Sequence, residues 1–211
     1  MKGIFITLEG PDGSGKTTQI NFLNEYLRKK GYEVILTREP GGTIISERIR
    51  QIILDINHKE MSDMTEALLY ASARAQHVDQ VIKPALNEGK IVICDRFVDS
   101  SIAYQGLARG IGMELIESIN KFATNGIIPD ITILLDIKAE LGIKRKKSQA
   151  ELDRLEVQKL EFHNKVCEGY KILAQNNKDR IKVIDGTKSI DQIRNQVISL
   201  IDDILINKNY N

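Results

Sequence analysis

Nine residues near the start of the chain have the types and the spacing of a phosphate-binding loop. The segment reads GPDGSGKTT and fits the pattern G-x-x-x-x-G-K-[ST]. Glycines in such a loop let the backbone turn so that successive N–H groups point at a polyphosphate. Lys16 can reach the terminal phosphates, and the Thr17 hydroxyl can bind Mg²⁺. A chance match on a Gly-rich turn is the alternative. The candidate nucleotide-binding residues are Gly10, Pro11, Asp12, Gly13, Ser14, Gly15, Lys16, Thr17 and Thr18.

A second candidate for phosphate chemistry is the pair Asp95-Arg96, which ends a short apolar run. The run Ile91–Asp95 has the composition of a buried strand that ends in a carboxylate. Downstream of a phosphate-binding loop, such a carboxylate can bind Mg²⁺ together with Thr17. The guanidinium of Arg96 can hold a phosphate through two parallel hydrogen bonds. Many strands end in aspartate by chance, so the metal role of Asp95 is a hypothesis.

Further arginines could face the same site. Arg38 follows the second expected strand and precedes the turn Glu39–Gly42, which contains one proline and two glycines. A structural surface ion pair with Glu39 is the alternative for Arg38. Arg48 and Arg50 lie on the next expected helix, and either could turn back toward the same opening.

Other side chains are suited to a planar base. Tyr70 and Arg74 are four residues apart and would share a helix face, where they could stack on a ring and bond its carbonyl edge. The alternative is a core tyrosine beside a solvated arginine, and the spacing alone favours it. If residues 99–106 are helical, Ser101 and Gln105 share a face. The Gln105 carboxamide offers one donor and one acceptor, which matches the imide edge of a pyrimidine.

Residues 144–150 read KRKKSQA, a basic segment with no apolar periodicity. This composition predicts a mobile loop, and a solvated run of charge is the usual alternative. A chain that handles phosphates, however, needs cations that close over the γ-phosphate and exclude water. We therefore interpret residues of about 142–152 as a lid.

The elements that must position these side chains alternate along the chain. Apolar runs rich in β-branched residues predict strands at Ile4–Leu8, Glu33–Thr37, Ile91–Asp95, Ile131–Asp136 and Ile181–Ile184. Helical patterns lie at Thr17–Lys30, Ser46–Ile56, Asp63–Glu88, Met113–Thr124, Ala139–Arg145, Leu152–Asn176 and Ile190–Ile206. This alternation predicts an α/β fold in three layers, with a five-stranded parallel sheet between helices. Ligands of such folds bind outside the carboxyl ends of the strands.

Composition excludes several classes of protein. A chain of 211 residues with 42% hydrophobic and 28% charged residues is ordinary for a globular protein, and we expect one domain, 1–211. The net charge of +1 gives no overall attraction to nucleic acid or acidic membranes. No apolar run approaches the ~20 residues that span a bilayer. The N-terminus leads directly into the first expected strand, which argues against a signal peptide. The two cysteines have no metal-ligand spacing, and we expect thiols in a reducing cytoplasm.

Taken together, these features resemble the bacterial thymidylate kinases, a family of P-loop nucleoside monophosphate kinases. The resemblance runs almost the whole chain, and its specificity comes from the order of the motifs. They are GPDGSGKTT, Arg38–Gly42, Leu68–Ala71 followed by Arg74-Ala75, Asp95-Arg96 followed by Ser100-Ser101 and Ala103–Gly106, and Asp153–Glu156.

The resemblance implies roles for the acceptor, dTMP. Asp12 would bind the 3′-hydroxyl of the sugar, and Tyr104 would pack near its 2′ position and disfavour ribonucleotides. Tyr70 stands where the family usually has a phenylalanine that stacks on thymine. Arg74 and Gln105 would bond the thymine edge. The acceptor phosphate would be held by Arg38, by Arg96 and, nearby, by Arg50.

The resemblance also implies ATP as donor, with Lys16, Thr17 and Asp95 serving ATP and Mg²⁺. Family members with glycine at the position of Gly13 generally supply catalytic arginines from the lid, and Arg145 is the lid's only arginine here. We therefore expect Arg145 to be the catalytic cation with Lys16 and Arg96, and Lys147 to be a weaker helper. Ile44, where many members have proline, is a local loop change.

The sequence thus predicts a cytoplasmic kinase that moves the γ-phosphoryl group of ATP to dTMP, giving dTDP and ADP. The family implies a homodimer, with the long Asp63–Glu88 helix as a contributor. One alternative is a kinase for another nucleoside monophosphate or for a deoxynucleoside. A nucleotide-gated binding or regulatory protein is an alternative of another class, although the clustered arginines argue against it.

Overall fold

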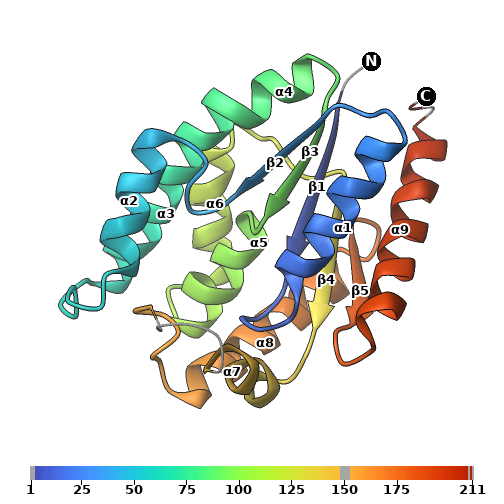
Figure 1. Cartoon of the computed structure of the whole chain (residues 1–211). Helices are drawn as coiled ribbons and strands as arrows, with labels where there is room; N and C mark the ends of the chain where they lie inside the picture. The colour runs from blue at the N-terminus through green and yellow to red at the C-terminus, as the bar shows by residue number, and fades with distance from the viewer. Residues whose placement is uncertain (1–2, 148–152, 209, 211) are drawn as a thin grey trace.

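The computed structural model describes residues 3–147, 153–208 and 210. At its centre is one sheet of five parallel strands in the order β2-β3-β1-β4-β5 (Figure 1). The strands are β1 Ile4–Glu9, β2 Val34–Arg38, β3 Ile91–Asp95, β4 Ile131–Asp136 and β5 Ile181–Asp185. This confirms the predicted fold class.

Helices cover both faces of the sheet (Figure 1). On one face, α1 and α9 lie side by side over the middle strands. The opposite face is covered by the helical segments that precede and follow β3 and by α8. The helical segments are α1 Lys16–Lys29, α2 Ile44–Leu54, α3 Asp63–His77, η1 Val78–Ile82, α4 Lys83–Asn87, α5 Val98–Ser101, η2 Ile102–Ala108, α6 Met113–Ala123, α7 Ala139–Lys147, α8 Leu160–Asn176 and α9 Ile190–Asn207.

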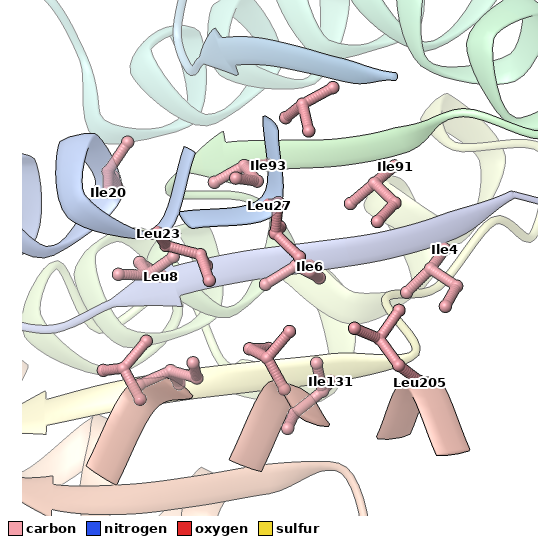
Figure 2. Close-up of a cluster of buried hydrophobic side chains, with 14 of the residues drawn as sticks. Ile4, Ile6, Leu8, Ile20, Leu23, Leu27, Ile91, Ile93, Ile131 and Leu205 are labelled. Atoms are coloured by element: carbon pink, nitrogen blue, oxygen red, sulfur yellow. The ribbon is translucent and has the colours of Figure 1, made fainter. Parts of the chain in front are cut away.

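The alternation of side chains along β1 divides the core into two halves. Ile4, Ile6 and Leu8 are fully buried under α1 and α9 (Figure 2). Phe5 points to the opposite face, where it packs edge-on against Phe97 with ring centroids 4.9 Å apart. A strand buried on both faces is typical of a parallel sheet, and this rigid frame fixes where the ends of the strands lie.

The expected helix Asp63–Glu88 is a continuous helical run with an irregular middle. α3 passes into the π-helical turn η1 and then into α4. Pro84 has no backbone N–H and therefore cannot complete the regular ladder in the preceding turn. The local widening accommodates this proline without ending the helix.

Two expectations about the segment after β4 are wrong. The helix expected at Ala139–Arg145 continues through Lys146 and Lys147, which were expected in a loop. The helix expected from Leu152 begins at Leu160, because the Asp153 carboxylate accepts hydrogen bonds from the backbone N–H groups of Leu155 and Glu156 and favours turns instead. Residues 148–152 of the expected lid lie outside the described residues.

Within the described ranges, no helix is both long enough and apolar enough to cross a membrane.

Candidate active site

The carboxyl ends of β2, β3 and β1 meet at a cavity of about 880 Å³. Leu8, Arg38 and Asp95 lie at the same level of the sheet, because both Leu8 and Arg38 are register partners of Asp95. The cavity is lined by most of the sequence-predicted residues, namely Asp12, Gly13, Ser14, Gly15, Lys16, Thr17, Thr18, Arg38, Arg50, Tyr70, Arg74, Asp95, Arg96, Ser101, Tyr104, Gln105 and Arg145.

The loop between β1 and α1 has the conformation that its glycines allow. Gly13 and Gly15 have φ angles of 73° and 95°, in the left-handed region that favours glycine. Lys16 folds back over the loop, and its ammonium group donates to the carbonyl oxygens of Gly10 and Pro11 at 3.1 Å each. Gly10 and Pro11, which were predicted to contact the nucleotide, are not among the residues that line the cavity.

The pKa of Lys16 is lowered to about 8, first by burial and then by the nearby Arg96 guanidinium. The carboxylates of Asp95, Asp12 and Glu9 act in the opposite direction but do not offset these effects. A bound phosphate would place negative charge beside the buried ammonium group and stabilise its charged form. Lys16 is therefore suited to a polyphosphate ligand.

Asp95 meets the requirements of a metal ligand. Its Oδ1 atom is buried and has no hydrogen-bond partner among the described residues. The Ser14 hydroxyl is buried and unpartnered among the described residues as well, and Thr17, in the first turn of helix α1, lines the same cavity. Carboxylate and hydroxyl oxygens are the hard ligands that Mg²⁺ prefers. The residues present therefore fit a magnesium ion.

Arg96 organises the polar centre of the cavity. It has a left-handed backbone, with φ of 68°, and its N–H donates to Leu8 O at 3.0 Å. Its guanidinium donates to Asp12 at 2.7 Å and to the Tyr170 hydroxyl at 2.9 Å, while the Tyr104 hydroxyl donates to Asp12 at 2.9 Å.

Asp12 is held in its charged form by this arrangement. Burial raises its pKa, but the charges of Arg96 and Lys16 outweigh burial and hold the pKa well below its usual range. The carboxylate therefore remains an acceptor for hydrogen bonds throughout the neutral range.

Sequence reasoning missed Glu9, the last residue of β1. Its fully buried carboxylate accepts hydrogen bonds from Phe97 N and Ser100 Oγ at 2.6 Å each and from the Tyr170 hydroxyl at 2.9 Å. Burial, and then the charge of Asp99, raise its pKa to about 7 despite Arg96. An acidic residue that closes an otherwise apolar strand was the available signal.

Arg74 is buried, so the alternative of a solvated charge is wrong. Its guanidinium donates to Glu39 at 2.6 Å, to Ser101 Oγ at 3.0 Å and to Phe97 O at 3.1 Å, and it also donates to Asn120. It lines the cavity beside Tyr70.

The alternative of a surface pair between Arg38 and Glu39 is also wrong. The Glu39 carboxylate is buried and bonds Arg74 and His77, whereas Arg38 pairs with Glu47 at 3.0 Å. Arg38 is the last residue of β2 and Glu39 follows it directly, and at the end of an extended strand neighbouring side chains point to opposite sides.

Of the two arginines on α2, Arg50 faces the cavity. Its Nη1 donates to Pro40 O at 2.9 Å, and Arg48 is exposed to solvent. Residues 98–108 are helical, which is the condition under which Ser101 and Gln105 were predicted to share a face. Both side chains are buried and line the cavity.

Helix α7 brings Arg145 to the phosphate-binding loop. Its Nη1 donates to Gly13 O and Gly186 O, each at 3.3 Å. This approach depends on glycine, because a Cβ on Gly142 would lie 2.3 Å from Asp12 O. The Lys147 side chain lies outside the described part of the structure.

A family model for thymidylate kinase matches residues 8–197. The chain belongs to the thymidylate kinase family. The thymidylate kinase of Geobacillus sp. (strain WCH70) is 53% identical over 205 residues, which are 96% of this chain and 98% of that protein. The thymidylate kinase of Clostridium novyi (strain NT) is 50% identical over 198 residues, covering 93% and 97%.

A solved member of the thymidylate kinase family has the same fold. The crystal structure of thymidylate kinase from Ehrlichia chaffeensis superposes with a TM-score of 0.79 at 36% identity, covering 96% of this chain and 99% of that one. The family predicted from the order of the sequence motifs is thereby confirmed.

Proposed function

We propose that the protein transfers the γ-phosphoryl group of ATP to the 5′-phosphate of dTMP, giving ADP and dTDP. One observation carries this proposal beyond family membership. A single cavity of about 880 Å³ joins the phosphate-binding loop to a second end lined by Tyr70, Arg74 and Gln105. A site for one nucleotide with no acceptor would not need both ends.

The donor end belongs to ATP. The N–H groups of residues 13–18 and the N-terminus of α1 face its phosphates, and Lys16 leaves the loop carbonyls to bond them. Thr17 and Asp95 would hold Mg²⁺, and the ion would supply positive charge that neutralises the phosphates. The unpartnered Asp95 Oδ1 supports this assignment.

The acceptor end belongs to dTMP. Arg38, Arg50 and Arg96 bind its phosphate, and all three line the cavity. Asp12 accepts a hydrogen bond from the 3′-hydroxyl of the sugar, and Tyr104, bonded to Asp12, closes the space at the 2′ position.

The base would lie against the aromatic ring of Tyr70. Arg74, Ser101 and Gln105 then face the polar edge of thymine. Because these side chains are buried, a base that leaves one of them unpaired binds much more weakly.

Catalysis consists of positioning and charge neutralisation. The two phosphates are brought in line, and Lys16, Arg96 and Arg145 stabilise the charge that spreads over the transferred group. A phosphate acceptor is already a competent nucleophile, so no general base is required. The contact of Arg145 with Gly13 supports its role as the lid cation.

We further propose that the chain is one domain and works as a cytoplasmic homodimer. Large apolar side chains on the outer faces of two packed helices support the dimer, namely Ile45, Ile52 and Ile56 at or after α2 and Met64 and Leu68 on α3. The two cysteines, Cys94 and Cys167, are free thiols that form no disulfide, which suits a reducing compartment.

A panel of nucleoside monophosphates tests the proposal. With Mg-ATP, purified protein should phosphorylate dTMP with a higher kcat/KM than UMP, CMP or dCMP. Lys16→Met should abolish turnover while circular dichroism stays unchanged. A higher kcat/KM for another monophosphate would show that dTMP is not the acceptor. Hydrolysis of ATP without phosphorylation of any monophosphate would favour a regulatory protein.

A further inference from the structure

Glu66, on α3, is a buried carboxylate that the proposed mechanism does not use. It is fully shielded from solvent, yet three side chains donate to it. Gln105 Nε2 bonds its Oε1 at 2.9 Å, and Arg154 and Arg109 bond its Oε2 at 2.5 and 3.0 Å. Arg109 Nε also reaches Oε1, at 3.3 Å.

This arrangement determines which way the Gln105 amide points. Both carboxyl oxygens of Glu66 already accept hydrogen bonds from guanidinium groups. The atom of Gln105 that touches Glu66 must therefore be the amide nitrogen, because an amide oxygen would meet another acceptor. Gln105 lines the cavity, and its carbonyl oxygen, which does not touch Glu66, is the acceptor that the side chain can offer a ligand there.

Arg74 supplies the opposite polarity at the same end of the cavity. Nε donates to Glu39, Nη1 to Ser101 and Asn120, and Nη2 to Phe97 O. A guanidinium has five N–H groups, so one on Nη2 has no acceptor in the described structure. A donor and an acceptor that line the same end of the cavity match a ring edge that presents C=O next to N–H.

We propose that Glu66 is a specificity-determining residue, which holds the Gln105 amide so that the site accepts 4-oxo pyrimidines and rejects 4-amino pyrimidines. Thymine and uracil present O4 and N3–H to Arg74 and Gln105. Cytosine presents an amino group to the donor and a lone pair to the acceptor, and both contacts are repulsive. Glu66 touches no substrate atom and acts through Gln105, so it is a positioning residue. The inference rests on the base position proposed above.

The test compares kcat/KM for dTMP, dUMP and dCMP in four proteins. Glu66→Gln keeps the shape but can donate to Gln105, so the amide can turn over. We expect the dTMP/dCMP ratio of kcat/KM to fall about 10- to 100-fold, mainly through KM, with dTMP and dUMP affected alike. Arg109→Met is the matched control, because it disturbs the same cluster but leaves the contact between Glu66 and Gln105. It should keep the wild-type ratio.

Gln105→Met separates this inference from the proposed base position. A wild-type ratio in Gln105→Met would mean that the base does not lie beside Gln105, and both ideas would fall. Loss of the ratio in Gln105→Met with a wild-type ratio in Glu66→Gln would overturn the role of Glu66 alone. A loss of the ratio in Arg109→Met equal to that in Glu66→Gln would also overturn it, since general loosening would then suffice.

A measurement on the wild-type protein covers the case in which Glu66→Gln does not fold. The side-chain NH₂ signals of Gln105 can be assigned by their absence from the NMR spectrum of Gln105→Met. If one of these protons is donated to Glu66, its signal exchanges slowly with solvent and shifts little when dTMP is added. A large shift on addition of dTMP would show that the nitrogen faces the nucleotide, contrary to the inference.

Discussion

Replacing Gly142 with alanine tests whether the packing of α7 on the phosphate-binding loop matters for catalysis. A Cβ at this position would lie 2.3 Å from Asp12 O, and ordinary contact begins at 3.4 Å, so one side must move by about 1 Å. The loop is continuous with β1 and α1, both anchored in the core, and α7 is therefore the element that shifts. Arg145 is carried with it.

A displacement of about 1 Å in a charged group that acts on the transition state can lower a rate about 100-fold. We expect kcat of Gly142→Ala to fall by about that factor, with KM for dTMP within about twofold, because the acceptor side chains lie on other elements. Steady-state kinetics with a coupled assay for ADP measures both constants.

Glu140→Ala, on the exposed side of the same helix, is the control and should keep the wild-type kcat. In an unstrained helix, glycine to alanine stabilises by up to about 1 kcal/mol. A Gly142→Ala protein that is more stable to urea and retains full kcat would refute the close contact and with it the argument for α7.

Three other predictions test separate parts of the site. Arg145→Ala should lower kcat about 100- to 1000-fold with little change in KM for dTMP, and an unchanged kcat would place the catalytic cation elsewhere. Arg74→Met leaves the buried Glu39 carboxylate without its partner at 2.6 Å, so urea denaturation should show a loss of about 3 to 5 kcal/mol, and a loss below about 1 kcal/mol would contradict the pairing. The pKa of Glu9 is raised from 4.5 to about 7 by burial and by Asp99, so folding favours its protonated form and this stabilisation is lost as pH rises through that window. Relative to Glu9→Gln, wild-type protein should lose up to about 3 kcal/mol of unfolding free energy between pH 4.5 and 7, and a constant difference would argue against the shift.

The strands could be predicted closely from the sequence because each is an apolar run with its own local signal. All five lie within one residue of their expected limits at either end. The first residue of α8 could not be predicted in this way, because side-chain hydrogen bonds compete there with the helical backbone bonds. Apolar periodicity carries no information about that competition. The Asp153 side chain bonds two backbone N–H groups that a helix would otherwise use, and turns result.

Some residues of the candidate site could likewise be predicted from the sequence, and others could not. The phosphate-binding loop is contiguous, so its residue types and spacing are visible in one short segment. Glu9 and Glu66 carry no such signal. Glu9 bonds a backbone group 88 positions away, and Glu66 bonds Arg154 across 88 positions as well. Only the packing of β1, α3, η2 and the segment after α7 brings these groups together.

The sequence by itself determined the family, the alternation of strands and helices, and the residues offered to the nucleotides, because these depend on local patterns and on the order of motifs. The tertiary structure decided how those residues are held. It buried Arg74 with Glu39, turned the Gln105 amide through Glu66, and set α7 against the loop through Gly142. The physical reason is burial. A polar group removed from water must find its partner within the fold, and that partner is chosen by three-dimensional packing rather than by distance along the chain.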